Sequence, residues 1–400
     1  MSGIYRLKGS LQHYIWGGSE YIPQLLNQEK KQSHYAELWL GAHSSSPSII
    51  EIEGQLQNLN EFLHEHPQAL GQGSRSEFGN ELPYLLKILD VAQPLSIQLH
   101  PTKQQAEAGF AAENAKGIPL TDPKRTYKDN NHKPEMMIAL SDFWLLHGFK
   151  SRDKILQCLN ARPSLQPLAQ QLETQDLHSF YAHIMQADQA HLSAWLLPLI
   201  KANQAAYDKG ELKEDNPDYW LLYCLQAMQI PLTKLDPGLI CFYLFNIVHT
   251  KKGEGIFQDA GIPHAYLRGQ NIELMACSDN VIRGGLTPKH VDIAALLQVV
   301  NCREVEPQII APAPQDRAGF TYPTPARDFA LENIPYQQGE SYQAKAENAA
   351  ILLVMEGEIK IRQNSTALSL SRGESVFICA DSQYQLEGLS AGYAVLAKLP

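Results

Sequence analysis

Short apolar runs separated by turn residues fill the first 150 positions of the chain. Residues 82–91 and 95–99 have the length and apolar content of buried β-strands. Between about residues 152 and 230 the pattern changes, because glycine becomes scarce and Ala, Leu and Gln return at helical spacing, as in 192–200 and 219–225. The pattern predicts a helical insertion that follows a strand-rich region.

Strand-like patterning returns at residues 239–274, and the segment 292–300 then predicts a further helix. Thr287 is the expected N-cap of that helix and Pro288 its first residue, which would place Lys289 in the first helical turn. Five prolines between positions 307 and 325 indicate a linker or an extended crossing of the surface.

The C-terminal region contains an echo of an earlier segment. Gly253-Glu254-Gly255-Ile256-Phe257 resembles Gly373-Glu374-Ser375-Val376-Phe377, which follows it by 120 residues. A Gly-Glu turn that leads into a short strand is typical of jelly-roll folds, so the echo favours two related barrels. The same offset sets Tyr384 where the first copy has His264. The alternative is a coincidence between two generic turn–strand segments.

Composition and charge narrow the class of protein. A chain of 400 residues exceeds what one hydrophobic core usually organises, so two or three domains are expected. The net charge is −10 and no basic block is present, which argues against nucleic acid or an anionic membrane as a partner. No signal-peptide pattern or run of ~18 apolar residues occurs. Six scattered cysteines without a CxxC pair indicate reduced thiols in a cytoplasmic protein.

Four residues form a candidate metal site. Gln98 and His100 are two positions apart, so on a strand their side chains share a face. Glu135 and His264 add a carboxylate and a second imidazole. Zinc accepts such donors, but two histidines and a carboxylate also suit the facial triad of non-haem iron oxygenases, so these residues alone leave the metal open. Other histidines are expected to be structural: His13, His43, His132, His147, His249 and His290.

Two charged residues interrupt apolar strands. Lys87 lies within the apolar run 85–91, where an ammonium group needs a polar pocket or a charge partner. Glu273 is flanked by apolar residues in 271–277 and is the first candidate for a general base. The competing interpretation is a carboxylate paired with a neighbouring Lys or Arg.

Several segments around these residues resemble a known family. They are Ser-Ile-Gln-Leu-His-Pro at 96–101, Asn-His-Lys-Pro-Glu at 131–135, Gly-Ile-Pro-His-Ala-Tyr at 261–266 and Asn-Val-Ile-Arg-Gly-Gly-Leu-Thr-Pro-Lys at 280–289. They are similar to those of the type I mannose-6-phosphate isomerases, zinc enzymes of the cupin superfamily. The resemblance implies a mainly β fold of cupin-type jelly-roll barrels, one catalytic and one non-catalytic at the C-terminus, with an inserted all-helical domain.

The predicted division of the chain combines this resemblance with the pattern. Residues 1–150 form the first part of the catalytic region, 151–235 the helical domain, 236–306 the second part of the catalytic region, and 307–400 the linker and the non-catalytic barrel. The resemblance also implies one zinc ion per chain, with Gln98 as its fourth ligand.

The activity implied by the resemblance is the reversible isomerisation of mannose 6-phosphate and fructose 6-phosphate through an enediol, a step of mannose metabolism. No obligate protein partner is implied. The resemblance makes Arg283 an active-site residue, and Glu273 is the candidate proton shuttle. Basic and hydroxyl groups in the matched segments are candidates for holding the anionic sugar phosphate: Ser96, Lys87, Lys133 and Lys289. Trp16 and the segment 37–39 also match the family, and the tryptophans Trp16 and Trp39 are interpreted as packing or pocket wall.

Two other functions use the same residues differently. An iron cupin oxygenase would use His100, Glu135 and His264, but it needs neither Gln98 nor a phosphate cradle. A sugar-phosphate sensor without catalysis would keep the cradle and dispense with the metal.

Overall fold

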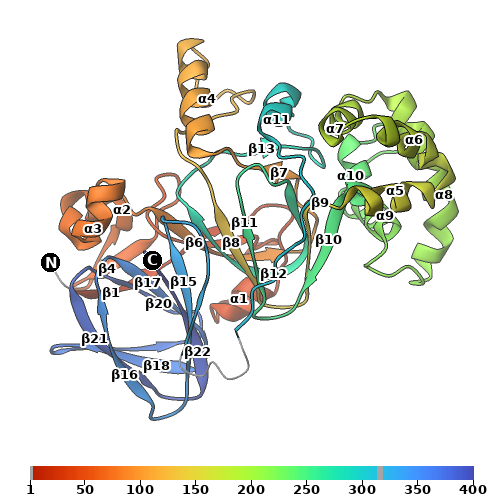
Figure 1. The fold of residues 1–400 in the computed structure, drawn as a ribbon. Coiled ribbons are helices and arrows are strands. Elements are labelled where there is room, and N and C mark those ends of the chain that lie inside the picture. Colours follow the sequence, from red (N-terminus) through yellow and green to blue (C-terminus); the bar gives the residue numbers. More distant parts are fainter. Residues whose placement is uncertain (1–2, 313–318) are drawn as a thin grey trace.

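The computed structural model describes residues 3–312 and 319–400 and is built mainly from antiparallel strands (Figure 1). Three sheets of eight, ten and four strands account for the strands of the described residues. The predicted mainly β fold with inserted helices is confirmed. Within the predicted proline-rich linker, residues 313–318 lie outside the described part of the chain.

The ten-stranded sheet carries the residues nominated for chemistry. Its central path runs β10-β9-β12-β6-β3-β2, while β8 joins β11 to β12 and β7 joins β13 to β12. The strands are β2 (Ser10–Gln12), β3 (Glu37–Leu40), β6 (Tyr84–Val91), β7 (Gln98–Leu99), β8 (Glu135–Ala139), β9 (Phe143–Phe149), β10 (Phe245–Thr250), β11 (Gly255–Gln258), β12 (His264–Ala276) and β13 (Ile282–Arg283).

Strand β12 is shared by two parts of this sheet. Its first residues pair with β9 and β7, and its residues from Gly269 onward pair with β6 and β8. At the change of partners Gly269 has φ of +125°, and a Cβ atom there would lie 2.6 Å from the carbonyl oxygen of Asp142. Only glycine tolerates that conformation and that close approach. Gly269 therefore marks the point where β12, the strand that carries both His264 and Glu273, changes its partners.

The centre of the eight-stranded sheet is buried on both faces. Along β17, Leu352 and Val354 pack in a core shared with the four-stranded sheet, whereas Ile351 and Leu353 pack in a core shared with β3 and β6. Alternate residues of a strand point to opposite faces, so a strand covered on both sides is apolar at every position. This is why residues 350–355 form an unbroken apolar run.

The N-terminal strand belongs to the sheet of the C-terminal region. Ile4 of β1 lies opposite Ile378 of β20, and Leu7 lies opposite Ile50 of β4. Sheet pairing thus joins the predicted 1–150 and 307–400 units. The strands of the two remaining sheets are β1 (Ile4–Lys8), β4 (Ile49–Ile52), β5 (Gln55–Asn58), β14 (Phe320–Tyr322), β15 (Ala330–Tyr336), β16 (Ser341–Ala346), β17 (Ala350–Glu356), β18 (Glu358–Gln363), β19 (Thr366–Ser371), β20 (Ser375–Ile378), β21 (Ser382–Gly388) and β22 (Gly392–Lys398).

The echoed segments adopt the same local structure. Gly253 and Gly373 have φ of +89° and +84°, and each precedes a glutamate that leads into β11 or β20. The Glu254 carboxylate accepts a hydrogen bond from the backbone N–H of Lys251 at 2.8 Å, and Glu374 accepts one from Ser371 at 2.7 Å. Glycine supplies the positive φ of the turn, and the carboxylate caps it. Tyr384 is buried in β21, in the core between the eight-stranded and the four-stranded sheet.

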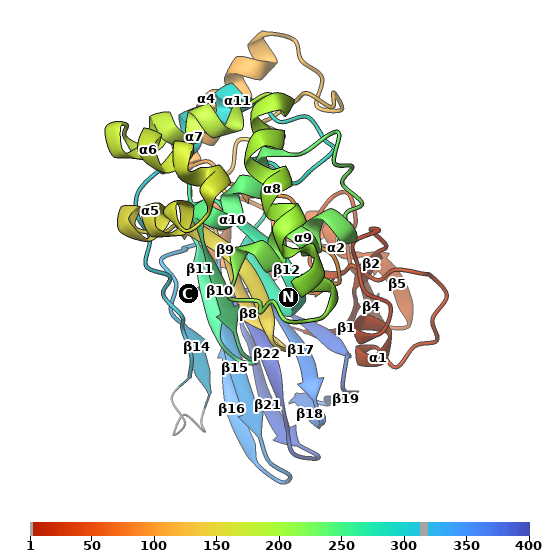
Figure 2. The same cartoon turned by 90° about the vertical axis from the view of Figure 1, so that its right-hand side faces the viewer.

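Helices inserted between β9 and β10 form a layer on one side of the ten-stranded sheet (Figures 1 and 2). The side chains of Asp176, Asp188 and Asn216 accept backbone N–H groups at the starts of α7, α8 and α9, as good N-caps do. The inserted elements are α5 (Arg152–Asn160), η2 (Pro163–Leu165), α6 (Gln166–Thr174), α7 (Leu177–Met185), α8 (Gln189–Asp208), α9 (Pro217–Ala227), η3 (Pro237–Ile240) and α10 (Cys241–Leu244). The boundaries predicted at 151 and 235 remain a proposal.

The helix predicted after Thr287 begins later. Helix α11 (Ile293–Val299) is capped by Asp292, whose carboxylate accepts the N–H of Ala295 at 2.9 Å. The Thr287 hydroxyl instead accepts the N–H of Lys289 at 3.1 Å in a local turn. The expectation that Thr287 caps the helix and that Lys289 adds to its N-terminal amides is therefore wrong. Aspartate is the stronger N-cap, and the Thr287 hydroxyl already accepts a hydrogen bond within its own turn.

The remaining helices lie in the first 115 residues. They are α1 (Tyr21–Leu25), α2 (Leu59–Glu65), η1 (Pro67–Leu70), α3 (Gln72–Phe78) and α4 (Lys103–Ala115). Across the described ranges, no helix has both the length and the apolar character needed to cross a membrane.

Candidate metal centre

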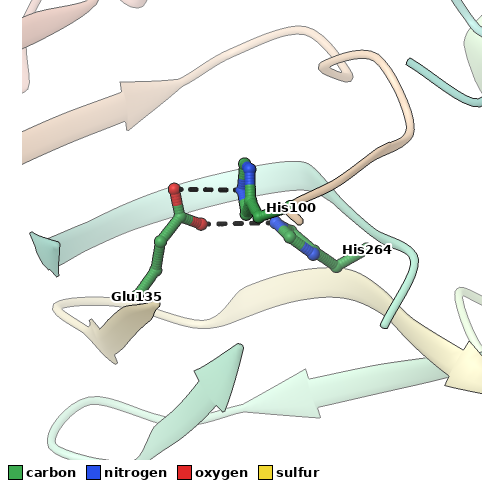
Figure 3. A group of neighbouring side chains, drawn as sticks. All are labelled: His100, Glu135 and His264. Carbon is green, nitrogen blue, oxygen red and sulfur yellow. Dashed lines mark ion pairs between the residues drawn. The ribbon is translucent and has the colours of Figure 1, made fainter. Parts of the chain in front are cut away.

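Three predicted metal ligands, all on or next to strands of the ten-stranded sheet, converge on one point (Figure 3). His100 directly follows β7, and Glu135 and His264 are the first residues of β8 and β12. Nε2 of His100 lies 3.3 Å from Oε1 of Glu135, and Nε2 of His264 lies 3.3 Å from Oε2 of the same carboxylate. Each of the three residues is only 1% exposed.

The far side of each imidazole is fixed by a backbone carbonyl. Nδ1 of His100 donates to the carbonyl oxygen of Asn280 at 2.8 Å, and Nδ1 of His264 donates to that of Ile262 at 3.0 Å. A neutral imidazole has one N–H, so each Nε2 presents a lone pair. Both Nε2 atoms and Oε2 of Glu135 are buried without a hydrogen-bond partner. Buried acceptors that face one another are unfavourable unless a cation lies between them.

Gln98 shares the face of His264. In the antiparallel ladder Gln98 lies directly opposite His264 on one side and opposite Arg283 on the other. Directly opposed residues of an antiparallel pair project to the same face of a sheet. The register therefore turns the amide of Gln98 and the guanidinium of Arg283 toward the same side as the His264 imidazole.

The donor set and its spacing fit zinc. Two ligands about 2.0–2.1 Å from a tetrahedral ion lie about 3.3–3.4 Å apart. The two separations of 3.3 Å between imidazole nitrogen and carboxylate oxygen agree with that value. The three side chains also form the one group of three or more His, Cys, Asp or Glu residues with metal-ligand spacing in residues 3–312 and 319–400.

Burial and neighbouring charges set the protonation states of two of the ligands. Burial acts to raise the pKa of Glu135, but Lys133, whose Nζ lies 3.2 Å from Oε1, and the imidazole of His100 outweigh it and hold that pKa well below its usual range. Burial lowers the pKa of His100 to about 4. At neutral pH the carboxylate is ionised and His100 is neutral, which is the form in which both bind metal.

A cavity of about 240 Å³ opens beside these ligands. Its lining includes most of the residues predicted to contact metal or substrate, namely Lys87, Gln98, Lys133, Glu135, Glu273 and Lys289. Ser96 and Arg283 are half-buried and do not line it. Arg283 lies close enough to Lys289 that, after burial, it is the second cause of the lowered pKa of that lysine.

A larger cleft of about 1950 Å³ holds none of the three ligands. Eight carboxylate residues line it against three Lys or Arg residues, so it repels an anionic substrate. The carboxylate residues are Glu61, Glu65, Glu77, Glu81, Asp129, Asp259, Asp279 and Asp328, and the basic ones are Lys103, Lys128 and Arg327. The smaller cavity is therefore the candidate site for a sugar phosphate.

Comparisons with known proteins agree with this geometry. Residues 4–152 match the model of the phosphomannose isomerase type I catalytic domain, and residues 319–396 match that of the mannose-6-phosphate isomerase cupin domain. The mannose-6-phosphate isomerase of Salmonella typhimurium is 37% identical over 391 residues, which cover 94% of this chain and 95% of the relative. The chain belongs to the type I mannose-6-phosphate isomerase family. The human family member is 31% identical over 417 residues, covering 96% of this chain and 95% of its own.

Solved structures of the family share the whole fold. The Salmonella typhimurium enzyme bound to substrate and to zinc superposes with a TM-score of 0.87 at 33% identity, covering 99% of each chain. A zinc-bound mannose 6-phosphate isomerase gives the same TM-score and identity over the same coverage.

One family-matched residue has a position that the sequence did not reveal. Lys87 lies between two carboxylates, with Nζ 3.6 Å from Oε2 of Glu273 and 3.6 Å from Oε2 of Glu37, and 4.7 Å from the ring centre of Trp39. The sequence had given Glu37 no role, and the structure shows it to be a buried ion-pair partner that lines the cavity. The sequence signal for Glu37 was a charged residue between the apolar residues Ala36 and Leu38. A charged residue within an apolar run was also the signal for Lys87.

The second carboxylate of this cluster is held from both sides. Oε1 of Glu273 accepts a hydrogen bond from the hydroxyl of Tyr266 at 2.8 Å, while Oε2 faces Lys87. Burial and the charge of Glu135 raise the pKa of Glu273, and Lys87 opposes the rise. Glu273 is therefore a paired carboxylate at the wall of the cavity, and its role as a general base stays a prediction.

Proposed function

We propose that the chain interconverts mannose 6-phosphate and fructose 6-phosphate at one zinc ion held by Gln98, His100, Glu135 and His264. The observation that carries the proposal is the set of three buried, unpartnered ligand atoms beside a cavity lined by lysines. Membership of a family with a solved member that holds both zinc and substrate supports the same assignment.

The reaction transfers a proton between C1 and C2 of the open-chain sugar through an enediol. Zinc, when bound, polarises the sugar oxygens and stabilises the negative charge that develops on them. Glu273 is the proposed group that removes and returns the proton, because its carboxylate borders the cavity and its pKa is raised towards the working range. Lys87 keeps that carboxylate ionised between turnovers, and Tyr266 orients it.

Three basic residues are proposed to bind the anionic groups of the substrate. Arg283 and Lys289 have no carboxylate partner among the described residues, and their mutual closeness forms a local positive field in a protein of net charge −10. Lys133 already neutralises Glu135 and also lines the cavity, so it serves both ligand and substrate. Ser96, which precedes β7 and is half-buried, is proposed to donate its hydroxyl to a phosphate oxygen.

Metal analysis combined with an isomerase assay tests the proposal. We expect about one zinc per chain, loss of mannose 6-phosphate isomerisation on chelation, and recovery when zinc is returned. His264→Ala should lose both metal and activity. Iron in place of zinc, or sugar-phosphate binding without turnover, would contradict the proposed function, and full zinc occupancy in His264→Ala would contradict the ligand set.

A further inference from the structure

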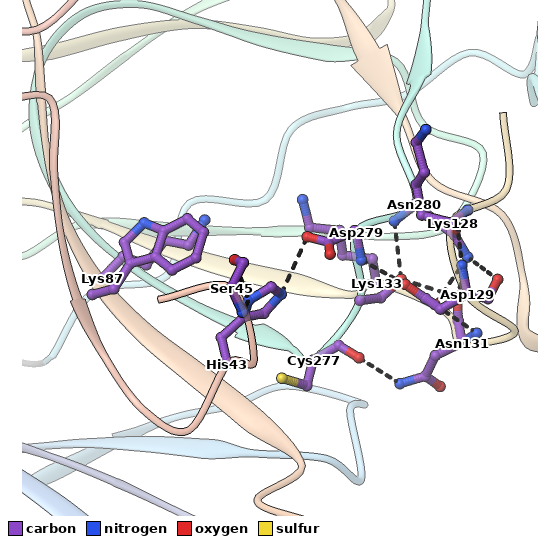
Figure 4. A network of polar contacts seen from close by, with 12 residues as sticks. His43, Ser45, Lys87, Lys128, Asp129, Asn131, Lys133, Cys277, Asp279 and Asn280 are labelled. Carbon is purple, nitrogen blue, oxygen red and sulfur yellow. Dashed lines mark hydrogen bonds and ion pairs between the residues drawn. The ribbon is translucent and has the colours of Figure 1, made fainter. Parts of the chain in front are cut away.

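Asn280 is hydrogen-bonded to the neighbouring segment 128–131 and so joins it to the segment 277–280 (Figure 4). The residue lies between β12 and β13 and is fully buried. Its backbone carbonyl oxygen is the acceptor for Nδ1–H of His100 at 2.8 Å. The position of this carbonyl therefore sets the tautomer of His100 and the direction in which its Nε2 lone pair points.

The side chain of Asn280 fixes where that carbonyl lies. Its Nδ2 donates to the carbonyl oxygens of Asp129 and Asn131, both at 2.8 Å, and its Oδ1 accepts the backbone N–H of Lys128 at 2.7 Å. Both ends of one amide group are thus bonded to the loop 128–131. A planar amide held at both ends cannot shift without breaking several buried hydrogen bonds.

Asp129 closes the same junction from the opposite loop. Its carboxylate accepts the N–H of Asp279 at 2.7 Å and the hydroxyl of Ser278 at 2.8 Å, as well as the N–H of Asn131 at 2.8 Å. Asn131 in turn donates through Nδ2 to the carbonyl oxygen of Cys277 at 3.0 Å. Loops 128–131 and 277–280 therefore form one rigid unit.

Each loop leads within a few residues to a group of the site. After Asn131 the chain reaches Lys133 and then Glu135, whose side chains form an ion pair. After Asn280 it enters β13, where Arg283 lies opposite Gln98. The junction thus connects the carbonyl of Asn280, which orients His100, with the segment that leads to Glu135 at the start of β8.

We propose that Asn280 is a positioning residue of the metal site, which holds Nε2 of His100 in register with the Glu135 carboxylate through its side-chain amide. The inference rests on the proposed function. It assigns to the amide of Asn280 a role in metal affinity and turnover that is separate from a role in folding.

Asn280→Ala tests this proposal because it keeps the backbone carbonyl and removes only the amide. We expect zinc affinity, measured by competition with a chromophoric chelator, to fall about 10- to 100-fold, the usual effect of losing an outer partner of a metal ligand. The visible spectrum of the cobalt-substituted protein should change, since it reports ligand geometry. We expect kcat to fall while KM changes little.

Asn246→Ala is the matched control. The amide of Asn246 donates to the carbonyl oxygens of Val305 at 2.8 Å and His147 at 3.1 Å, and it contacts no proposed ligand. Its removal should lower the melting temperature and leave zinc affinity and the cobalt spectrum unchanged. If Asn280→Ala does not fold, Asp129→Asn opens the same junction and should show a smaller loss in the same direction.

The outcomes separate this inference from the proposed function. Zinc affinity in Asn280→Ala and Asp129→Asn equal to that of the unaltered protein, or an equal loss in Asn246→Ala, would overturn the positioning role and leave the isomerase assignment intact. An unaltered protein that binds no zinc would overturn both.

Discussion

Replacing Lys87 with Met removes one charge from a buried cluster of three. Nζ of Lys87 lies 3.6 Å from a carboxylate oxygen of Glu37 and 3.6 Å from one of Glu273, and each of these side chains is less than a tenth exposed. Met preserves the length and apolar stem of the lysine. The change therefore removes only the ammonium group and leaves the carboxylates of Glu37 and Glu273 without the ion-pair partner that they share.

The magnitude follows from the separation of the charges. At 3.6 Å and an effective dielectric constant of about 20, each attraction is on the order of 4–5 kcal/mol, and breaking a buried ion pair typically costs about 3–5 kcal/mol. We expect the free energy of unfolding of Lys87→Met to fall by about 3–5 kcal/mol at pH 8, because two buried carboxylates lose their shared ion-pair partner.

The loss should be smaller in acid. Burial and Glu135 already raise the pKa of Glu273, and removal of Lys87, which opposes them, raises it further. A carboxyl group whose pKa is higher in the folded than in the unfolded state stabilises the fold at low pH. That contribution is lost as the pH rises through the folded-state pKa. The deficit of Lys87→Met should therefore shrink between pH 8 and pH 5.

Chemical denaturation at both pH values measures this difference, with Lys398→Met as the control. Lys398 pairs with Glu332 at 2.6 Å on a partly exposed surface, so its loss should cost less than about 1 kcal/mol. The acid limb of kcat against pH should also move to higher pH in Lys87→Met, because Glu273 must be ionised to accept a proton. A deficit equal at both pH values, or no larger than that of the control, would refute the reasoning.

The remaining predictions concern the substrate side and the second barrel. Arg283→Ala should fold normally and lose about 1.5–3 kcal/mol of a charge-assisted contact, or about ten- to over a hundredfold in turnover or affinity, in steady-state assays. Lys289→Ala should chiefly raise KM, because a phosphate far from C1 and C2 is held similarly in the ground and transition states; unchanged kinetics in both variants would return these residues to a structural role. A crystal structure of the zinc-loaded protein should show no metal among side chains beyond Asp328, since Tyr384 stands where the repeat offset places a histidine, and an ion found there would contradict this.

Local sequence features predicted a large part of the fold. The apolar run that contains β6, the Gly-Glu turns before β11 and β20, and the helical spacing in the inserted region all have causes within a few residues of one another. The donor types at His100, Glu135 and His264 could likewise be recognised from the sequence, because few side chains bind metal, whereas Gln98 as a ligand came only from the family resemblance. The family resemblance added which of the fourteen histidines to consider.

Tertiary pairing decided the rest. The period of a strand states which residues share a face but not which strand lies opposite, so the placement of β1 beside β20 and of Gln98 between His264 and Arg283 required the sheet register. The role of Glu37 depended on a lysine fifty residues away in sequence. The start of α11 was misassigned because two capping residues competed, and only the folded turn at Thr287 excluded one. Contacts of this kind form between segments that are far apart in the sequence, and they stabilise the protein only once the chain has folded.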